Sequence, residues 1–292
     1  MEIRFGVVGT AYWAAAVHTV GLGAVPGARL AGIWGRDVDK ARALAAQRGT
    51  VAFESFEAML AAVDAVSLAV PPQVQESLAL RAIAAGKHVL LEKPIATTHR
   101  RAVEIADAVA ARGVASMVFF TRRFVPELAA AIERHAARDW QRAEIEVRSA
   151  ALSAGSPYEH SSWRLADGAA LWDIGPHVLS VLIAMLGPVV GARRLPAPAR
   201  VVRFETRHAR GASASVSLTL HATPAEQGQR YRFMDAADEF VLPEPAFERP
   251  TAYANAVVAL VAAIAGGARA HPCDVRLGAE TVRILEAVAR AT

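Results

Sequence analysis

Cysteine is nearly absent from this chain of 292 residues, which contains Cys273 alone. A disulfide bond within the chain is therefore excluded, as is usual for proteins of reducing compartments. Cys273 stands just ahead of an expected helix, in HPCDVRLGAE. A reactive thiol and a small packed side chain both fit that position, and we expect the packed side chain.

Long hydrophobic runs are also missing. The richest apolar stretch, VLSVLIAMLG at 178–187, is too short to span a bilayer. The N-terminal MEIRFGVVG has an acidic second residue and a strand-length apolar run, unlike a signal peptide. These features predict a soluble, cytoplasmic protein without a membrane partner.

A strong excess of one charge is absent as well, since the formal net charge is +4 and the pI is near 9.6. No run of Lys and Arg with interleaved aromatic residues occurs, which argues against a nucleic-acid partner. The scattered arginines predict a solvated surface, although a basic site for an anionic cofactor is compatible with them. Hydrophobic residues make up 53% and charged residues 21%, enough apolar material for a large ordered core.

What the sequence does contain is a regular alternation over its first 120 residues. Nearly continuous apolar runs such as IRFGVVG and DAVSLAV alternate with segments of helical spacing. Several of these segments have an N-cap residue or a closing glycine, as in DVDKARALAAQRG. Six strands and five helices in this order predict a parallel sheet covered on both faces, the doubly wound Rossmann fold of the α/β class. We assign residues 1–121 to this dinucleotide-binding domain.

The pattern changes after residue 121. RVVRFETRH and SASVSLTLHA alternate polar and apolar residues, which is typical of an antiparallel sheet with one exposed face. Residues 122–292 are therefore predicted to form an α+β domain for substrate binding and oligomerisation, with a mostly antiparallel open sheet. Its exposed sheet face should pack against another subunit, giving a homodimer or homotetramer. Other expected features are a helix over 163–187, a linker at 191–200, and two closing helices at 251–265 and 275–290 that can pack back on the first domain.

The turn after the first strand, Gly9-Thr10-Ala11-Tyr12-Trp13-Ala14, is a degenerate form of G-x-G-x-x-G. Gly9 can form the tight turn, and Ala14 suits close packing of helix on strand. Ala11 replaces the glycine that lets the backbone approach a pyrophosphate. The turn could be an ordinary strand-to-helix connection, but its place on the first strand of a βαβ unit favours a phosphate site. The predicted cofactor contacts of this loop are Gly9, Ala11, Tyr12 and Trp13.

The end of the second strand bears on which cofactor is bound. An NAD site has Asp or Glu there, about 20 residues beyond the glycine turn, to bind the ribose 2′-hydroxyl. This chain has Gly35 followed by Arg36. A guanidinium without a competing carboxylate suits a 2′-phosphate, although Arg36 could be an ordinary surface residue. We therefore predict NADP as the cofactor, with NAD possible.

Two further strand ends are expected at the edge of the sheet where ligands bind. Val70 and Pro71 follow the fourth strand, and Glu92-Lys93-Pro94 follows the fifth. In an open α/β sheet, ligands bind outside the carboxyl ends of the strands. A lysine at this edge can act as a general acid or base, whereas a surface Glu–Lys pair on a turn is the structural alternative.

Asp173 and His177 are four residues apart in an otherwise apolar segment, DIGPHVL. If a helix begins at 174, both side chains lie on one face, and Pro176 suits its first turn. Asp173 could then be the N-cap, and His177 a packed core residue. Together they form a plausible proton-transfer pair in a cleft, whereas a metal site lacks a third ligand, so we predict none.

Taken in order, GVVGTAYWA, AVPP, AGKHVLLEKP, SSWR and GAALWDIGPHVL resemble the Gfo/Idh/MocA oxidoreductases, which include glucose–fructose oxidoreductase and inositol dehydrogenase. The resemblance implies that Lys93 and His177 serve the substrate hydroxyl, with Asp173 close by. It also implies that Trp163 and Arg164 contact cofactor or substrate, and that Arg123 lies near the nicotinamide. The chain departs from the family pattern at Gln75, where members often have His, at Ala11, and at the thinned glycine run GAAL.

These features predict an NAD(P)-dependent dehydrogenase or reductase acting on a sugar, cyclitol or related polyhydroxylated substrate. Lys93 or His177 would move the hydroxyl proton while hydride passes to or from nicotinamide. Two alternatives stay open: a non-catalytic NAD(P)-binding sensor, and a cofactor-assisted lyase or glycosidase on the same fold. The presence of both Lys93 and His177 argues against the sensor.

Overall fold

The computed structural model describes residues 2–267 and 270–291 and divides into two compact units. Unit 1 comprises Met1–Val125 and Phe247–Ala279, and unit 2 comprises Pro126–Ala246 and Glu280–Thr292. Within the described ranges, no helix combines the length and apolar character needed to cross a membrane.

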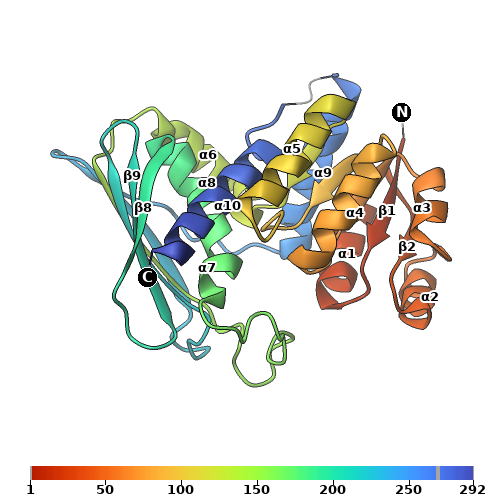
Figure 1. The fold of residues 1–292 in the computed structure, drawn as a ribbon, viewed down its shortest axis with the longest axis horizontal. Coiled ribbons are helices and arrows are strands. Elements are labelled where there is room, and N and C mark those ends of the chain that lie inside the picture. Colours follow the sequence, from red (N-terminus) through yellow and green to blue (C-terminus); the bar gives the residue numbers. More distant parts are fainter. Residues whose placement is uncertain (1, 268–269, 292) are drawn as a thin grey trace. The chain divides into compact units, whose positions relative to one another are not determined.

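Unit 1 is built on a six-stranded sheet in which every neighbouring pair of strands is parallel. The strand order is β3-β2-β1-β4-β5-β6, so the order reverses direction between β1 and β4. Two strands of this sheet, β1 and β2, are labelled in Figure 1. The predicted Rossmann architecture is confirmed, and the reversal marks the edge where such sheets bind ligands. The strands are β1 (Ile3–Val8), β2 (Ala28–Trp34), β3 (Val51–Ala52), β4 (Ala65–Leu68), β5 (His88–Leu91) and β6 (Ser116–Val118).

The helices of unit 1 begin where the sequence supplies capping side chains. Asp37, Ser55 and Thr98 each accept a hydrogen bond from the backbone N–H three residues on. One helix comes from the C-terminal part of the chain, since α9 packs against α1 within this unit. The helical segments are a π-helical turn (Ala14–His18), α1 (Thr19–Gly23), α2 (Val38–Gln47), α3 (Phe56–Ala62), α4 (Pro72–Ala84), α5 (His99–Arg112), a 3₁₀ turn (Thr121–Phe124) and α9 (Arg249–Ala265).

Unit 2 contains a second six-stranded sheet, of order β12-β11-β7-β10-β9-β8. Only β7 and β10 pair in parallel, so the predicted mostly antiparallel sheet is confirmed. Burial alternates along β7, β9 and β10, which leaves one face packed and the other exposed. The strands are β7 (Arg142–Arg148), β8 (Val189–Leu195), β9 (Val201–His208), β10 (Ser213–Thr219), β11 (Gly228–Met234) and β12 (Glu239–Val241).

The helices of unit 2 correct two predictions. The helix expected over 163–187 is wrong at its start and in its middle, because α7 (Ala169–Asp173) and α8 (Gly175–Leu186) meet at Ile174. Pro176 explains the break, since it has no N–H to donate to the carbonyl four residues back. The linker expected at 191–200 is wrong for its first half, which belongs to β8. The remaining helices are α6 (Pro126–Ala136) and α10 (Val275–Arg290), whose residues divide between the units.

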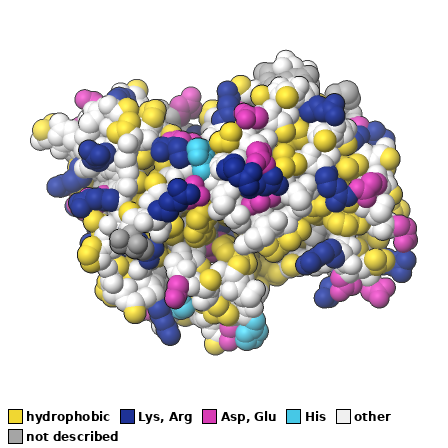
Figure 2. All heavy atoms as spheres, viewed as in Figure 1, with side chains coloured by type: hydrophobic (Ala, Val, Ile, Leu, Met, Phe, Trp, Pro, Cys, Tyr) yellow, Lys and Arg dark blue, Asp and Glu magenta, His cyan; other side chains and the backbone are white. Residues whose placement is uncertain are grey.

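Basic side chains are dispersed on the face drawn in Figure 2, where many dark blue groups lie beside magenta carboxylates. Such pairs include Arg100 with Glu104 and Arg193 with Glu205, both at 2.6 Å. This distribution fits the solvated arginine surface expected from the sequence.

Candidate active site

Gly9 ends the first strand of unit 1 in a backbone conformation that requires glycine. Its φ is +123°, and its N–H donates to the Trp34 carbonyl oxygen at 2.9 Å. A Cβ placed at Gly9 would lie 2.5 Å from the Ala69 carbonyl oxygen. The chain therefore turns tightly against the end of β4, as a phosphate-binding loop must.

The residues after Gly9 form an open entry to a helix. Ala11 and Tyr12 are exposed, whereas Ala14 is fully buried against the strands. The first turn is π-helical, from Ala14 to His18, and continues into α1. An exposed loop between a positive-φ glycine and a helix start fits the pyrophosphate of a dinucleotide. Ala11 lies in the solvent-exposed part of this loop.

The end of β2 lies against the same loop. A Cβ at Gly35 would meet the Thr10 Cγ2 at 2.7 Å, so a larger side chain there would displace the loop. The next carboxylate, Asp37, caps α2 by accepting from the Lys40 N–H at 3.1 Å. That backbone hydrogen bond, with the Lys40 ammonium, holds the pKa of Asp37 below its usual value. Arg36, between them, is exposed.

The loop is bonded directly to the predicted acid/base corner. The Trp13 indole Nε1 donates to the Glu92 Oε1 at 2.7 Å. The other carboxylate oxygen of Glu92 accepts from the Lys93 backbone N–H at 3.3 Å. Lys93 is half-buried, and its peptide bond to Pro94 is cis. Val70 and Pro71 follow β4 at the same edge of the sheet and are half-buried and exposed, respectively.

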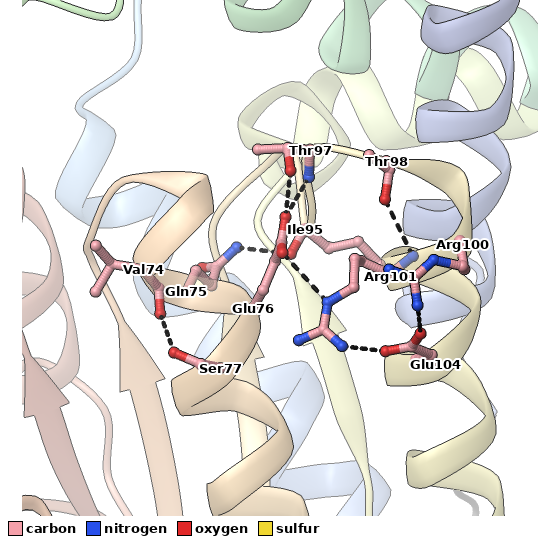
Figure 3. A network of polar contacts seen from close by, with 10 residues as sticks. All are labelled: Val74, Gln75, Glu76, Ser77, Ile95, Thr97, Thr98, Arg100, Arg101 and Glu104. Atoms are coloured by element: carbon pink, nitrogen blue, oxygen red, sulfur yellow. Dashed lines mark hydrogen bonds and ion pairs between the residues drawn. The ribbon is translucent and has the colours of Figure 1, made fainter.

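Helix α4 holds this corner from behind. The buried Gln75 amide donates to the Glu92 carbonyl oxygen at 2.7 Å, and its Oε1 accepts from the Glu92 N–H at 2.8 Å. The neighbouring Glu76 accepts from the Thr97 N–H and hydroxyl, both at 2.6 Å, and faces Arg101 of α5 (Figure 3). Gln75, which counted in the sequence only as a departure from the family, is thus a clamp on residues 92–95.

A buried chain of hydrogen bonds continues inward from Glu92. Glu92 Oε1 lies 3.0 Å from the His18 Nε2, and His18 Nδ1 lies 2.7 Å from the Ser67 hydroxyl. The Ser67 hydroxyl lies 2.5 Å from that of Tyr253, on α9. Burial raises the pKa of Tyr253 far above its usual range. Sequence reasoning missed His18, Ser67 and Tyr253. Only Ser67 carried a signal, as the single polar residue of β4.

In unit 2, Asp173 has a different role from the predicted helix cap. Ile174 is the N-cap of α8 and has no side-chain cap, so the capping alternative is wrong. The Asp173 carboxylate instead accepts from Arg164 Nε at 2.7 Å and from its Nη2 at 3.3 Å. The Arg164 guanidinium packs over the rings of Trp163, at 4.4 Å, and Tyr158, at 4.3 Å. Three predicted site residues, Trp163, Arg164 and Asp173, therefore form one cluster.

His177 lies in the first turn of α8 and is half-buried, one helical turn beyond Asp173. The backbone of Ile174 stays in the right-handed helical region, so the chain keeps a helical path between the two residues. Pro176 occupies the first turn of α8, as expected. Lys93 belongs to unit 1, and His177 and Asp173 belong to unit 2.

Arg123 lies in the 3₁₀ turn of unit 1, close to His271 and Cys273. Burial lowers the pKa of His271, and the Arg123 charge lowers it further. Cys273 is 1% exposed, and burial raises the pKa of its thiol to about 11, so the expected packed side chain is confirmed. Within the described part of the chain, no three His, Cys, Asp or Glu side chains are grouped to bind a metal ion.

The sheet with its strand-order reversal, the glycine turn and the open helix entry define a dinucleotide-binding protein of the α/β class. Residues 3–120 match the family described as "Oxidoreductase family, NAD-binding Rossmann fold", GFO_IDH_MocA. A dTDP-3,4-didehydro-2,6-dideoxy-alpha-D-glucose 3-reductase of Streptomyces antibioticus is 30% identical over 230 residues, 77% of this chain and 68% of the relative. The chain therefore belongs to the Gfo/Idh/MocA oxidoreductase family, as its motifs implied.

Other relatives share shorter segments. Inositol 2-dehydrogenase 1 of Saccharopolyspora erythraea is 37% identical over 131 residues, 43% of this chain, and the match covers only 39% of that relative.

Among solved structures, levoglucosan dehydrogenase in complex with NADH and levoglucosan superposes with a TM-score of 0.86. That comparison covers 100% of this chain and 98% of the other at 18% identity, which establishes a common fold.

Proposed function

We propose that this protein is a nicotinamide-dependent oxidoreductase that prefers NADP and interconverts a hydroxyl and a carbonyl group on a sugar, cyclitol or related polyhydroxylated compound. One observation carries the proposal: the Trp13 indole of the glycine loop is hydrogen-bonded to Glu92, directly before Lys93. This bond ties a dinucleotide loop to a candidate acid/base at the ligand-binding edge of one sheet.

The chain's own residues suit the cofactor. Gly9 and the exposed Ala11 and Tyr12 would hold the pyrophosphate, with Val70 and Pro71 at the next strand end. When bound, the nicotinamide supplies hydride transfer. Arg36, beside the side-chain-free Gly35, would face a ribose 2′-phosphate, because Asp37 is committed to capping α2. Trp163 and Arg164 are further proposed contacts.

Proton transfer is assigned to Lys93 or His177. A general acid/base must take the proton of the substrate hydroxyl as hydride leaves the same carbon, and return it in reduction. Asp173, held at 2.7 Å by Arg164, would orient His177 or accept a substrate hydroxyl. Arg123 is proposed to contact the substrate as a fixed cation.

The substrate class is supported by what the relatives are named for. The two curated relatives described above act on an inositol and on a dTDP-linked deoxysugar, according to their names. Inositol is a polyhydroxylated ring, and the name of the deoxysugar places carbonyl groups at C3 and C4 of a sugar ring, so both rings suit an exchange between hydroxyl and carbonyl. Lysine, histidine, aspartate and arginine side chains supply the donors and acceptors that the hydroxyl and carbonyl groups of such a ring require.

We also propose that the exposed face of the unit 2 sheet is the subunit interface of a homodimer or homotetramer. This face carries charges of both signs, as in the 2.6 Å pairs of Arg232 with Glu144 and Arg193 with Glu205. Analytical ultracentrifugation tests this directly, and a monomer at micromolar concentration would refute it.

The deciding experiment measures binding of NADP(H) and NAD(H) by calorimetry, followed by turnover with inositols, free sugars and sugar nucleotides. Lys93→Ala should lower kcat by about 10²–10⁴-fold with near-normal cofactor affinity, the usual contribution of a positioned acid/base. Lys87→Ala is a matched control, because Lys87 precedes β5 at its other end and donates to the Val63 carbonyl oxygen. Equal turnover of the two variants would remove Lys93 from the mechanism.

Cofactor preference has its own pair of variants. Arg36→Ala should weaken NADP(H) binding by about tenfold or more, the effect of one charge-assisted hydrogen bond, and leave NAD(H) binding unchanged. Arg29→Ala is the control, since Arg29 lies near the start of the same strand. Equal effects on both cofactors would contradict the NADP assignment.

A further inference from the structure

The buried chain from Glu92 to Tyr253 has a fixed direction of hydrogen bonding. The His18 ring and the Tyr253 side chain are fully buried, and their rings lie 4.2 Å apart. Among the described residues, the only hydrogen-bond partner found for the Tyr253 hydroxyl is Ser67. The phenol must therefore donate to Ser67, because an undonated buried hydroxyl would be costly.

This direction sets the protonation of His18. Ser67, which accepts from Tyr253, uses its own hydrogen to donate to the His18 Nδ1. If Nδ1 also carried a hydrogen, Tyr253, Ser67 and His18 would bring three hydrogens to only two contacts, Tyr253–Ser67 and Ser67–His18. Nδ1 must therefore carry no hydrogen. The ring then carries its hydrogen on Nε2, which donates to the Glu92 carboxylate at 3.0 Å.

The Glu92 carboxylate thus accepts from three donors. Its Oε1 receives the Trp13 indole N–H and the His18 N–H, and its Oε2 receives the Lys93 backbone N–H. Trp13 belongs to the glycine loop, and Lys93 to the proposed catalytic corner. Charged groups close to members of this cluster include Lys93, which follows Glu92, and Arg249, at 5.8 Å from the Trp13 ring. Arg48 bonds the Ala15 carbonyl oxygen and the Thr19 hydroxyl.

We infer that His18 is a positioning residue: as a neutral Nε2–H imidazole, it holds the Glu92 carboxylate so that the glycine loop and the Lys93 corner keep one fixed arrangement. The inference rests on the proposed function for its catalytic consequence. Its structural content concerns the free protein and is open to test without any turnover.

The first measurement is nitrogen NMR of the full chain labelled at histidine. At neutral pH the His18 ring should carry its hydrogen on Nε2, with Nδ1 bare. A His18 ring with its hydrogen on Nδ1 would overturn the inference.

The second measurement follows the Trp13 indole N–H resonance, assigned with Trp13→Phe, in two variants of His18. His18→Leu removes the donor to Glu92 and should shift that resonance. His18→Gln places an amide N–H near the former Nε2 and should restore it. His99→Leu is the control, because His99 lies at the start of α5, outside this cluster. An unmoved Trp13 signal in His18→Leu would refute the positioning role.

Kinetics then separates this inference from the proposed function. His18→Leu should lower kcat and raise the Kd of NADP(H), each by about tenfold, the worth of one hydrogen bond to a charged group. His18→Gln should recover both to within about threefold. If His18→Leu and His18→Gln are equally impaired, the donor role fails. If no variant, including the unmodified chain, shows turnover while the NMR results hold, the proposed function fails and the inference on His18 stands.

Discussion

Replacing Gly9 by alanine should disable the cofactor loop for a reason that can be worked out from its backbone. At a φ of +123°, any residue with a Cβ is strained, at a cost of about 1–2 kcal/mol. The added methyl would also lie 2.5 Å from the Ala69 carbonyl oxygen, a backbone atom that cannot rotate away. Overpacking of this kind typically costs a further 1–3 kcal/mol or so. Gly9→Ala should therefore lower the free energy of unfolding by about 2–5 kcal/mol.

The assay is urea denaturation followed by circular dichroism, with NADP(H) affinity measured by calorimetry. Gly49→Ala is the matched control, because Gly49 has a φ of +62° and no atom within 4 Å of the added Cβ. Gly49→Ala should lower the free energy of unfolding by about 1 kcal/mol only, the cost of the positive φ, and should leave cofactor binding normal. The reasoning is refuted if Gly9→Ala is no less stable than Gly49→Ala and binds the cofactor equally well.

Three other outcomes follow from particular side chains. Hydrogen bonds from Arg4 lower the pKa of Asp64 to about 2, so this pair stabilises the fold above about pH 4, and the contribution is lost as the pH falls through about 2. Asp64→Asn should cost about 1 kcal/mol near neutral pH, since the pair is partly exposed, and should flatten acid unfolding curves in that window. Cys273 should react with a disulfide reagent at pH 8 far more slowly than in urea, because the pKa of its thiol is about 11; equal rates would contradict its burial. Arg164→Ala should lower the melting temperature more than Arg193→Ala, since it leaves the buried Asp173 carboxylate without its guanidinium partner, and thermal denaturation compares the two.

The architecture of unit 1 was predictable because each local signal agreed with the global fold. Apolar runs of strand length alternated with helices, and Asp37, the first residue of DVDKARALAAQRG, caps its helix as expected. The two wrong predictions in unit 2, a helix over 163–187 and a linker at 191–200, have local causes. GARRL in β8 contains two arginines and no polar–apolar alternation, so it does not look like a strand. The apolar residues around Gly175 and Pro176 hid the break between α7 and α8.

The candidate site was also predictable only in part. The edge position of Glu92 and Lys93 followed from strand counting, because parallel strands end at one side of the sheet. The partners that hold them could not be predicted in this way. His18, Ser67 and Tyr253 are far apart in sequence, and each belongs to a mainly apolar segment. Side-chain networks depend on the angles at which elements pack, which periodicity does not encode. Gln75 shows the limit most clearly: sequence comparison marked it as a departure, whereas its amide bonds both backbone groups of Glu92.

A buried polar chain of this kind is costly to assemble, and its retention has a physical consequence. An apolar replacement of His18 could pack equally well, but it would leave the Glu92 carboxylate with one donor fewer in a partly buried site. Of the three lysines in the chain, at 40, 87 and 93, only Lys93 adjoins this network. If Lys93 transfers the proton as proposed, its position relative to the substrate depends on a fixed backbone. Gln75 and Glu92 fix that backbone from both sides, which is why a loss of His18 should be felt in kcat as well as in cofactor affinity.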